Sequence, residues 1–139
     1  MKSIAHRLKL ACDALCTILK AEAPYDTGNL ALDGIRVVEG EPGYFYVAVG
    51  GEIAPYAKYT QESWDNFGAP LKGKKNPNEG WINRGIEKAL PLIKQIMEGA
   101  ITEDEANEYL ESRGYTRELK EKQIKRAEYL EAKARKLVS

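Results

Sequence analysis

The residue types that most often carry catalysis or bind metals are scarce in this chain. His6 is the only histidine, and Cys12 and Cys16 are the only cysteines. Their C-x-x-x-C spacing is neither the redox C-x-x-C nor half of a zinc site with a second pair to complete it. On a helix, both cysteines fall on or beside the apolar stripe and His6 falls on the polar face, which predicts core thiols and a solvated imidazole. We therefore expect no enzymatic activity, no cofactor and no metal site.

A second candidate for chemistry is a group of basic and aromatic residues near the middle of the chain. Lys72, Lys74 and Lys75 follow Trp64 and Phe67 within one Gly/Pro-rich stretch. Lysines can contact phosphates and aromatic rings can stack on bases, so this group is a candidate nucleic-acid site. The alternative is that the lysines keep an exposed loop in solution. We favour this alternative because 21 basic and 21 acidic residues balance to zero net charge, whereas a duplex-DNA binder usually has a basic surface.

Two amphipathic helices and a hairpin must position these residues. Apolar residues at helical spacing run from Ile4 to Leu19, and Pro24 ends this first helix. The β-branched and aromatic runs 35–38 and 44–49 flank a Gly/Pro turn at 40–43, which predicts an antiparallel hairpin. Residues 81–97 predict a second helix, whose wide apolar face suits packing across a sheet and against another helix. The predicted fold class is α+β.

The segments between these elements supply the expected contact surfaces. In the second strand, Phe45 and Val47 should face the core, while Tyr44 and Tyr46 should face a partner. Residues 56–62 predict one or two helical turns. Residues 63–80 show no periodicity and contain five Gly or Pro residues, so we expect a long loop that is mobile alone and ordered by contact with another chain.

The chain should divide into a compact domain at 1–99 and a charged helical extension at 100–139. Thr102 and Glu105 match a capping box, Gly114 is a helix stop, and Thr116 should cap a last helix that ends near Leu137. The last helix has only a narrow apolar stripe. We therefore expect the extension to be dispensable for folding of the compact domain.

Charge divides the extension into two halves. Residues 98–112 contain six acidic and no basic residues, whereas the chain from Arg113 onward contains nine basic and four acidic residues. Opposite charges on consecutive helices indicate pairing, in a hairpin or between neighbouring subunits. The alternative is a solvated helix held by i,i+4 pairs. Those pairs would be Glu118–Lys122, Glu121–Lys125 and Glu131–Arg135.

Three segments together resemble a known family. Ala23-Pro24-Tyr25-Asp26-Thr27-Gly28-Asn29-Leu30 resembles the A-P-x-D-T-G-x-L signature of the small neck proteins of tailed bacteriophages, which are head–tail joining or tail-completion proteins. Pro55-Tyr56-Ala57-Lys58-Tyr59, followed by Glu62, is similar to that family's P-Y-A-x-[VY]-x-E block. Trp81 lies where the family places its aromatic-led final core helix. The resemblance covers roughly residues 4–97, and the helices after Gly99 extend beyond the usual pattern.

The resemblance implies a structural virion protein at the head–tail junction. Such a protein is made in the host bacterial cytoplasm, forms a ring homo-oligomer and contacts neighbouring connector or tail proteins, with DNA passing through the ring without sequence-specific binding. The motif residues and the aromatic residues of the loop would form its contact surfaces. The alternative function is a small nucleic-acid-binding module that uses the loop lysines and the basic last helix. A steep fall of DNA affinity with salt would favour that alternative.

Overall fold

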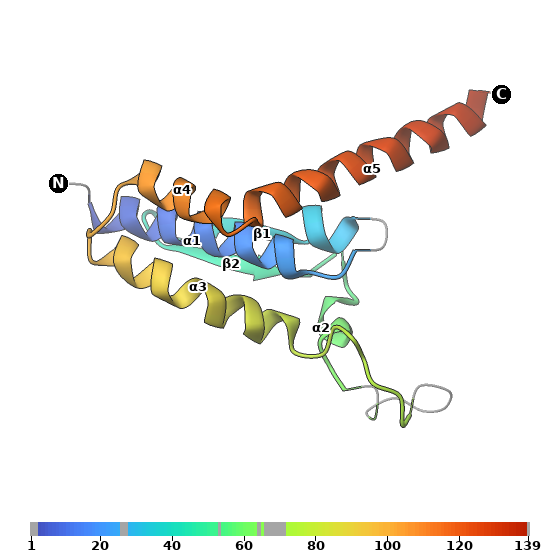
Figure 1. The fold of residues 1–139 in the computed structure, drawn as a ribbon, viewed down its shortest axis with the longest axis horizontal. Coiled ribbons are helices and arrows are strands. Elements are labelled where there is room, and N and C mark those ends of the chain that lie inside the picture. The colour runs from blue at the N-terminus through green and yellow to red at the C-terminus, as the bar shows by residue number, and fades with distance from the viewer. Residues whose placement is uncertain (1–2, 26–27, 53, 64, 66–71, 139) are drawn as a thin grey trace.

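The fold is a mixed α+β arrangement in which one long helix covers a small hairpin and further helices pack on that helix (Figure 1). The computed structural model describes residues 3–25, 28–52, 54–63, 65 and 72–138. The elements found among these residues are α1 (Ile4–Glu22), the π-helical turn η1 (Asn29–Asp33), β1 (Ile35–Glu39), β2 (Phe45–Val49), α2 (Ala57–Thr60), α3 (Trp81–Met97), α4 (Glu103–Ser112) and α5 (Tyr115–Val138). The predicted fold class is therefore confirmed.

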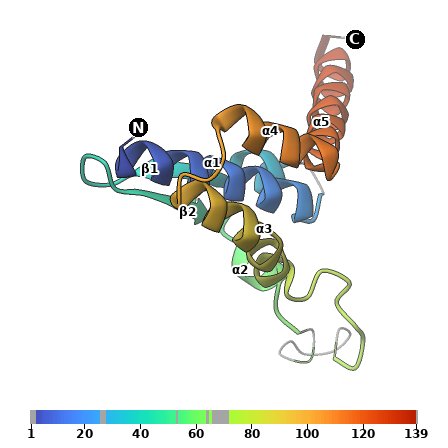
Figure 2. The same ribbon diagram turned by 60° about the vertical axis from the view of Figure 1, so that its left-hand side comes forward.

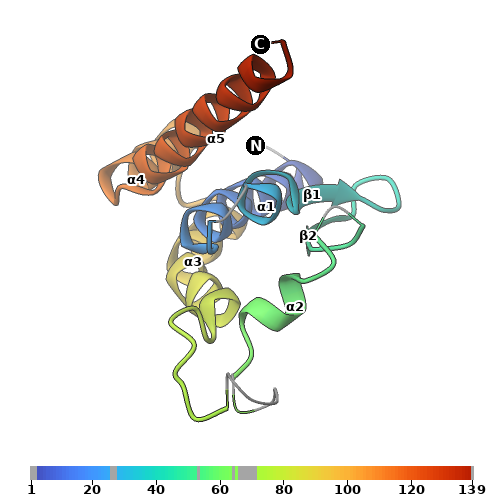
Figure 3. The same cartoon turned by 90° about the vertical axis from the view of Figure 1, so that its right-hand side faces the viewer.

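Helix α1 is the central element of the fold. Its N-terminus is capped by Ser3, whose hydroxyl accepts a hydrogen bond from the His6 amide at 3.1 Å, and it ends just before Pro24. It packs against α3, against both strands and against α4. Figure 3 shows α1 between α3 and the hairpin. Both the hairpin and the later helices are therefore positioned relative to α1.

The core consists of two apolar clusters that share α1. One cluster joins the second half of α1 to the hairpin, α2 and Trp81, and includes Leu19 and Ile35. The other joins α1, α3 and α4, and includes Ile18 and Ile96. Helices α1 and α3 approach closely at Gly85, where an added Cβ would lie 2.6 Å from Leu19 Cδ2. A side chain at position 85 would force the two helices apart.

The hairpin has the strands and the faces that the sequence predicts. Strands β1 and β2 are antiparallel, with Ile35 opposite Val49 and Val37 opposite Val47. Val37, Val47 and Val49 pack against the first cluster, whereas Tyr44 and Tyr46 are 68% and 53% exposed. The tyrosine face is therefore available for contact with another chain.

The expected position of α3 across the sheet is wrong. Helix α3 packs along α1, and it is α1 that covers the hairpin. Ile86 and Leu90 belong to the wide apolar face that the sequence predicts for residues 81–97, but both are exposed. The apolar face of α3 is narrower than predicted because α1 occupies the space between α3 and the strands.

Helix α4 packs into the core, whereas α5 packs only over its first half. The capping box of Thr102 and Glu105 is confirmed, and Ala106 and Leu110 are buried in the second cluster. The boundary expected near Gly99 therefore falls between elements that pack together. Helix α5 begins at Tyr115, so the expected cap at Thr116 is wrong.

Candidate interaction surface

A groove of about 300 Å³ opens between the end of α1 and α2. Its lining residues are Pro24, Tyr25, Leu30, Tyr56, Thr60 and Asn78. They belong to the two motif blocks at 23–30 and 55–62 and to the chain that leads into α3. The fold thus brings together two blocks that are about thirty residues apart in the sequence. This convergence makes the groove, with the exposed tyrosines beside it, the candidate interaction surface.

Backbone geometry after α1 shapes one wall of the groove. Gly28 adopts a left-handed conformation with φ at +89°, which favours glycine because it has no Cβ. The turn η1 follows, and the Gly34 amide donates to the Asn29 carbonyl oxygen at 2.6 Å. This turn buries Leu30 while leaving Asn29 exposed. A π-helical turn was not among the elements that the sequence predicted.

Thr60 and Asn76 fix the opposite wall. The Thr60 hydroxyl accepts a hydrogen bond from Trp81 Nε1 at 2.8 Å and donates to the Ala57 carbonyl oxygen at 2.6 Å. The buried Asn76 amide donates to the carbonyl oxygens of Thr60 and Glu62 at 2.9 and 2.8 Å. These bonds hold α2 against the start of α3. Tyr56 and Tyr59 are therefore presented from a rigid support.

Exposed tyrosine side chains lie at the groove and beside it. Tyr56 and Tyr59 are 41% and 53% exposed. Tyr25 lines the groove, and its hydroxyl is buried with no hydrogen-bond partner among the described residues. A buried hydroxyl without a partner costs free energy. What the groove and its surroundings present to solvent is aromatic area.

Several residues predicted to form contact surfaces lie in the core instead. Trp81 is fully buried with its indole nitrogen satisfied, and Leu30 and Ala57 are buried beside it. These three residues support the surface but do not form it. Asn29, Pro55, Tyr56 and Tyr59 are exposed, and Glu62 is half-buried. Asp26, Thr27, Trp64 and Phe67 lie outside the described residues.

The basic residues do not form a single patch. Lys72, Lys74 and Lys75 are exposed, but Figures 1 and 2 place residues 72–80 and α5 on opposite sides of the molecule. Several basic side chains of α5 are engaged within the chain. Arg117 pairs with Glu121, Lys122 bonds to α1, Lys125 lies over the Tyr25 ring, Arg126 pairs with Asp33, and Arg135 pairs with Glu131.

The cysteines and the histidine occupy the environments that their helical positions predict. Cys12 and Cys16 are buried, and burial raises the pKa of both thiols. A raised thiol pKa lowers the thiolate fraction at neutral pH, which is unfavourable for nucleophilic or redox chemistry. His6 is exposed on α1.

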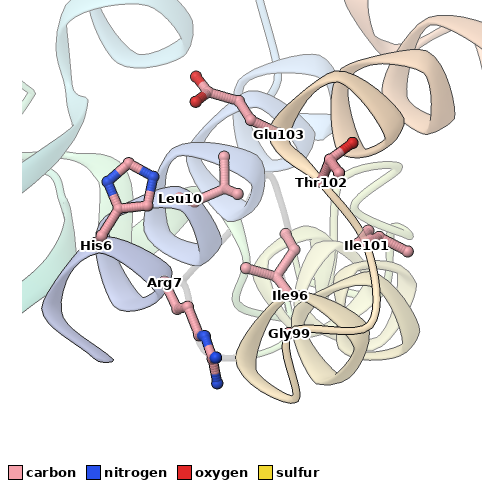
Figure 4. Close-up of a pocket in the computed structure, with 8 residues that line it drawn as sticks. All are labelled: His6, Arg7, Leu10, Ile96, Gly99, Ile101, Thr102 and Glu103. Atoms are coloured by element: carbon pink, nitrogen blue, oxygen red, sulfur yellow. The ribbon is translucent and has the colours of Figure 1, made fainter. Parts of the chain in front are cut away.

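A second hollow, of about 260 Å³, lies where α1, α3 and α4 meet (Figure 4). Leu10, Ile96 and Ile101 give it an apolar lining, and His6, Arg7 and Glu103 add polar groups. Arg7 lies beside Gly99 and donates to the Met97 carbonyl oxygen at 3.2 Å. The Thr102 hydroxyl accepts from the Glu105 amide within the capping box. The Arg7 guanidinium and the Thr102 hydroxyl therefore bond to backbone groups at helix ends, and the hollow lies at a junction between helices.

Neither a metal site nor a relative offers a more direct functional assignment. Within the described ranges, no three His, Cys, Asp or Glu side chains come together as metal ligands. None of the helices found there is both long and apolar enough to cross a bilayer. Comparisons with protein-family models, curated proteins and solved structures found no match. The functional argument therefore depends on the groove and the exposed tyrosines.

Proposed function

We propose that this chain is a structural subunit of the head–tail junction of a tailed bacteriophage. It assembles into a ring and bridges head and tail components. The observation that carries the proposal is the convergence of the two motif blocks on one groove beside α2. Two segments that resemble the same family, at the same relative positions, also lie together in space.

The surface is suited to contact with protein. Tyr56 and Tyr59 present large amphipathic rings of the kind that is enriched at protein interfaces. Tyr44 and Tyr46 on the hairpin provide a second, separate face, and a ring subunit needs one face for each neighbour.

Nucleic-acid binding is the second candidate, because Lys72, Lys74 and Lys75 are exposed close together in the chain. It is the weaker candidate because several basic residues of α5 already have partners within the chain. Fluorescence anisotropy with labelled duplex and single-stranded DNA distinguishes the two functions. A binding constant that falls steeply with salt would favour the nucleic-acid module.

A stop codon tests the proposed function directly. The experiment introduces an early stop codon into the reading frame for this chain in the phage or prophage that encodes it. Lysates are then examined by negative-stain electron microscopy. We expect filled heads and separate tails to accumulate, and a copy of the gene supplied in trans should restore joined particles. Normal virions from the stop-codon phage would contradict the proposal.

A further inference from the structure

The second half of α5 stands clear of the other elements in all three ribbon views (Figures 1–3). The helix has 24 residues and is therefore about 36 Å long. Its first half is held by Lys122 and Arg126, but α5 contains no buried residue. Leu137 and Val138 are 81% and 87% exposed. An isolated helical projection of this kind gains most of its stability from packing against a partner.

The last two turns of α5 combine positive charge with apolar area. Lys133, Arg135 and Lys136 lie between Ala132 and Val138, and Arg135 pairs with Glu131 one turn earlier. We call residues 132–138 the α5 tip. Ala127, Leu130, Ala134 and Leu137 recur at heptad spacing, which is the pattern of a helix that docks against another surface. Ala127 and Leu130 line a hollow against η1 of the same chain, so Ala134 and Leu137 are the members of this stripe that belong to the projecting end. The α5 tip is therefore a basic segment with an apolar edge.

A complementary acidic surface lies along α4, beside the end of α3. A groove of about 380 Å³ is lined by Gln95, Ile101, Glu105, Glu108, Tyr109 and Ser112. Ile101 and Tyr109 supply apolar area and the glutamates supply negative charge, while the Arg113 guanidinium lies over the Tyr109 ring at 4.7 Å from its centroid. Glu111 lies one turn beyond Glu108 and is also exposed. We call this surface the α4 groove.

We propose that the α5 tip of one copy docks in the α4 groove of the next copy. Leu137 and Val138 pack against Ile101 and Tyr109, while Lys133 and Lys136 face Glu108 and Glu111. A second copy is the occupant because one chain carries both complementary surfaces. The tip cannot reach the groove of its own chain, since α5 is a continuous helix that leads away from α4.

Docking of this kind is head-to-tail, with different surfaces used by the two copies. Such contacts close into rings when the rotation between copies allows it, and otherwise form open filaments. The α5–α4 contact would be one contact of the proposed ring, and to that extent it rests on the proposed function. Two helical turns bury less than the roughly 1,200 Å² of a standard stable interface, so each contact should be weak alone and reinforced by ring closure.

A charge-swap experiment tests the contact. The tip variant carries Lys133→Glu and Lys136→Glu, and the groove variant carries Glu108→Lys and Glu111→Lys. A control variant, Lys74→Glu with Lys120→Glu, changes the net charge of the chain as the tip variant does but leaves both surfaces intact. Self-association is measured by sedimentation velocity at concentrations up to about 1 mM, where contacts with Kd values near 1 mM are detected. Circular dichroism confirms that each variant folds.

We expect wild type and the control to self-associate, and added salt to weaken the association. For the tip variant alone and for the groove variant alone, the Kd of self-association should rise at least about tenfold, because two attractive pairs become repulsive. An equimolar mixture of the two variants should recover association, since each then meets the opposite charge. Leu137→Ser should also weaken association without any change of charge.

Three results would overturn the inference. They are a monomeric wild type at the highest concentration, unchanged association of the tip variant, and a mixture that fails to recover association. The junction role is judged separately by the stop-codon phage. If the wild-type chain joins heads to tails but stays monomeric, only the α5–α4 contact is contradicted. If the chain self-associates as expected but is not needed for joining, only the junction role is contradicted.

Discussion

The Lys122 ammonium donates a hydrogen bond to the Ala23 carbonyl oxygen at 2.8 Å, although 98 residues separate the two positions. The same ammonium donates to the carbonyl oxygens of Lys20 and Ala21 at 2.8 and 2.6 Å. These carbonyls end α1 and have no intrahelical partners, and the negative end of the helix dipole favours a cation there. Lys122 therefore ties α5 to the start of the first motif block.

Replacing Lys122 with methionine should destabilise the fold. Lys122→Met keeps the aliphatic length but leaves three partly buried carbonyl groups without this donor. We expect the free energy of unfolding to fall by about 2 kcal/mol, measured by urea denaturation. Lys120→Met, on an exposed position of the same helix, should change it by less than about 0.5 kcal/mol. Equal losses in the two variants would contradict the capping role of Lys122.

Replacing Thr60 with valine should loosen the support of the groove. Thr60→Val preserves the shape of the side chain but leaves the buried Trp81 indole N–H without its acceptor. We expect a loss of about 2 kcal/mol in the free energy of unfolding. Thr17→Val is the matched control, because the Thr17 hydroxyl donates only to the Asp13 carbonyl oxygen one turn earlier. The role assigned to Thr60 fails if Thr17→Val proves the more damaging change.

Replacing Tyr56 with alanine should separate stability from assembly. Tyr56 directly precedes α2 and is 41% exposed, so we expect Tyr56→Ala to lower the free energy of unfolding by less than about 1 kcal/mol. A central interface tyrosine can contribute about 2 kcal/mol or more to binding, so joining of heads to tails should fall strongly. Thermal melting of the purified chain and complementation of the stop-codon phage measure the two effects. A variant that melts far below wild type would make Tyr56 a core residue.

Two truncations should locate the end of the folded unit. Although the sequence suggested that residues 100–139 are dispensable for folding, the packing of Ala106 and Leu110 leads us to expect the opposite. A chain that stops at Gly99 should lose more than about 3 kcal/mol of stability, because Leu92 and Ile96 become exposed. A chain that stops at Ala127 should stay within about 1 kcal/mol of wild type. Equal stability of the two truncations and the full chain would restore the boundary at Gly99.

Local pattern made α1, α3 and the hairpin predictable. The 3.6-residue apolar period of Ile4–Leu19 and the β-branched runs on either side of 40–43 each specify one element without reference to the rest of the chain. The turn η1 has no such signature, because its i→i+5 hydrogen bond does not require a distinctive residue pattern. Helix α4 was assigned to an extension because most of its residues are polar or acidic. Only two of its side chains, Ala106 and Leu110, are buried, and two apolar positions do not give a clear core-facing pattern.

The tertiary contacts of individual side chains were harder to predict from the sequence. The sequence offered Lys122 an i,i+4 pair with Glu118 as one alternative, whereas its ammonium bonds to carbonyl groups about one hundred residues away. Trp81 was grouped with the motif residues expected to form contact surfaces, although it also begins the predicted core helix. The structure places it in the core, where the Thr60 hydroxyl satisfies its polar atom. Such assignments depend on contacts between distant segments, which no local pattern encodes.

In vitro joining tests the central claim most directly. Filled heads and free tails are isolated from the stop-codon phage, mixed with purified wild-type chain, and counted by negative-stain electron microscopy and by plaque formation. We expect wild-type chain to restore joined, infectious particles, and Tyr56→Ala to restore far fewer at the same concentration. Failure of the wild-type chain to join heads to tails, or equal joining by both chains, would contradict the assignment of this groove to the head–tail junction.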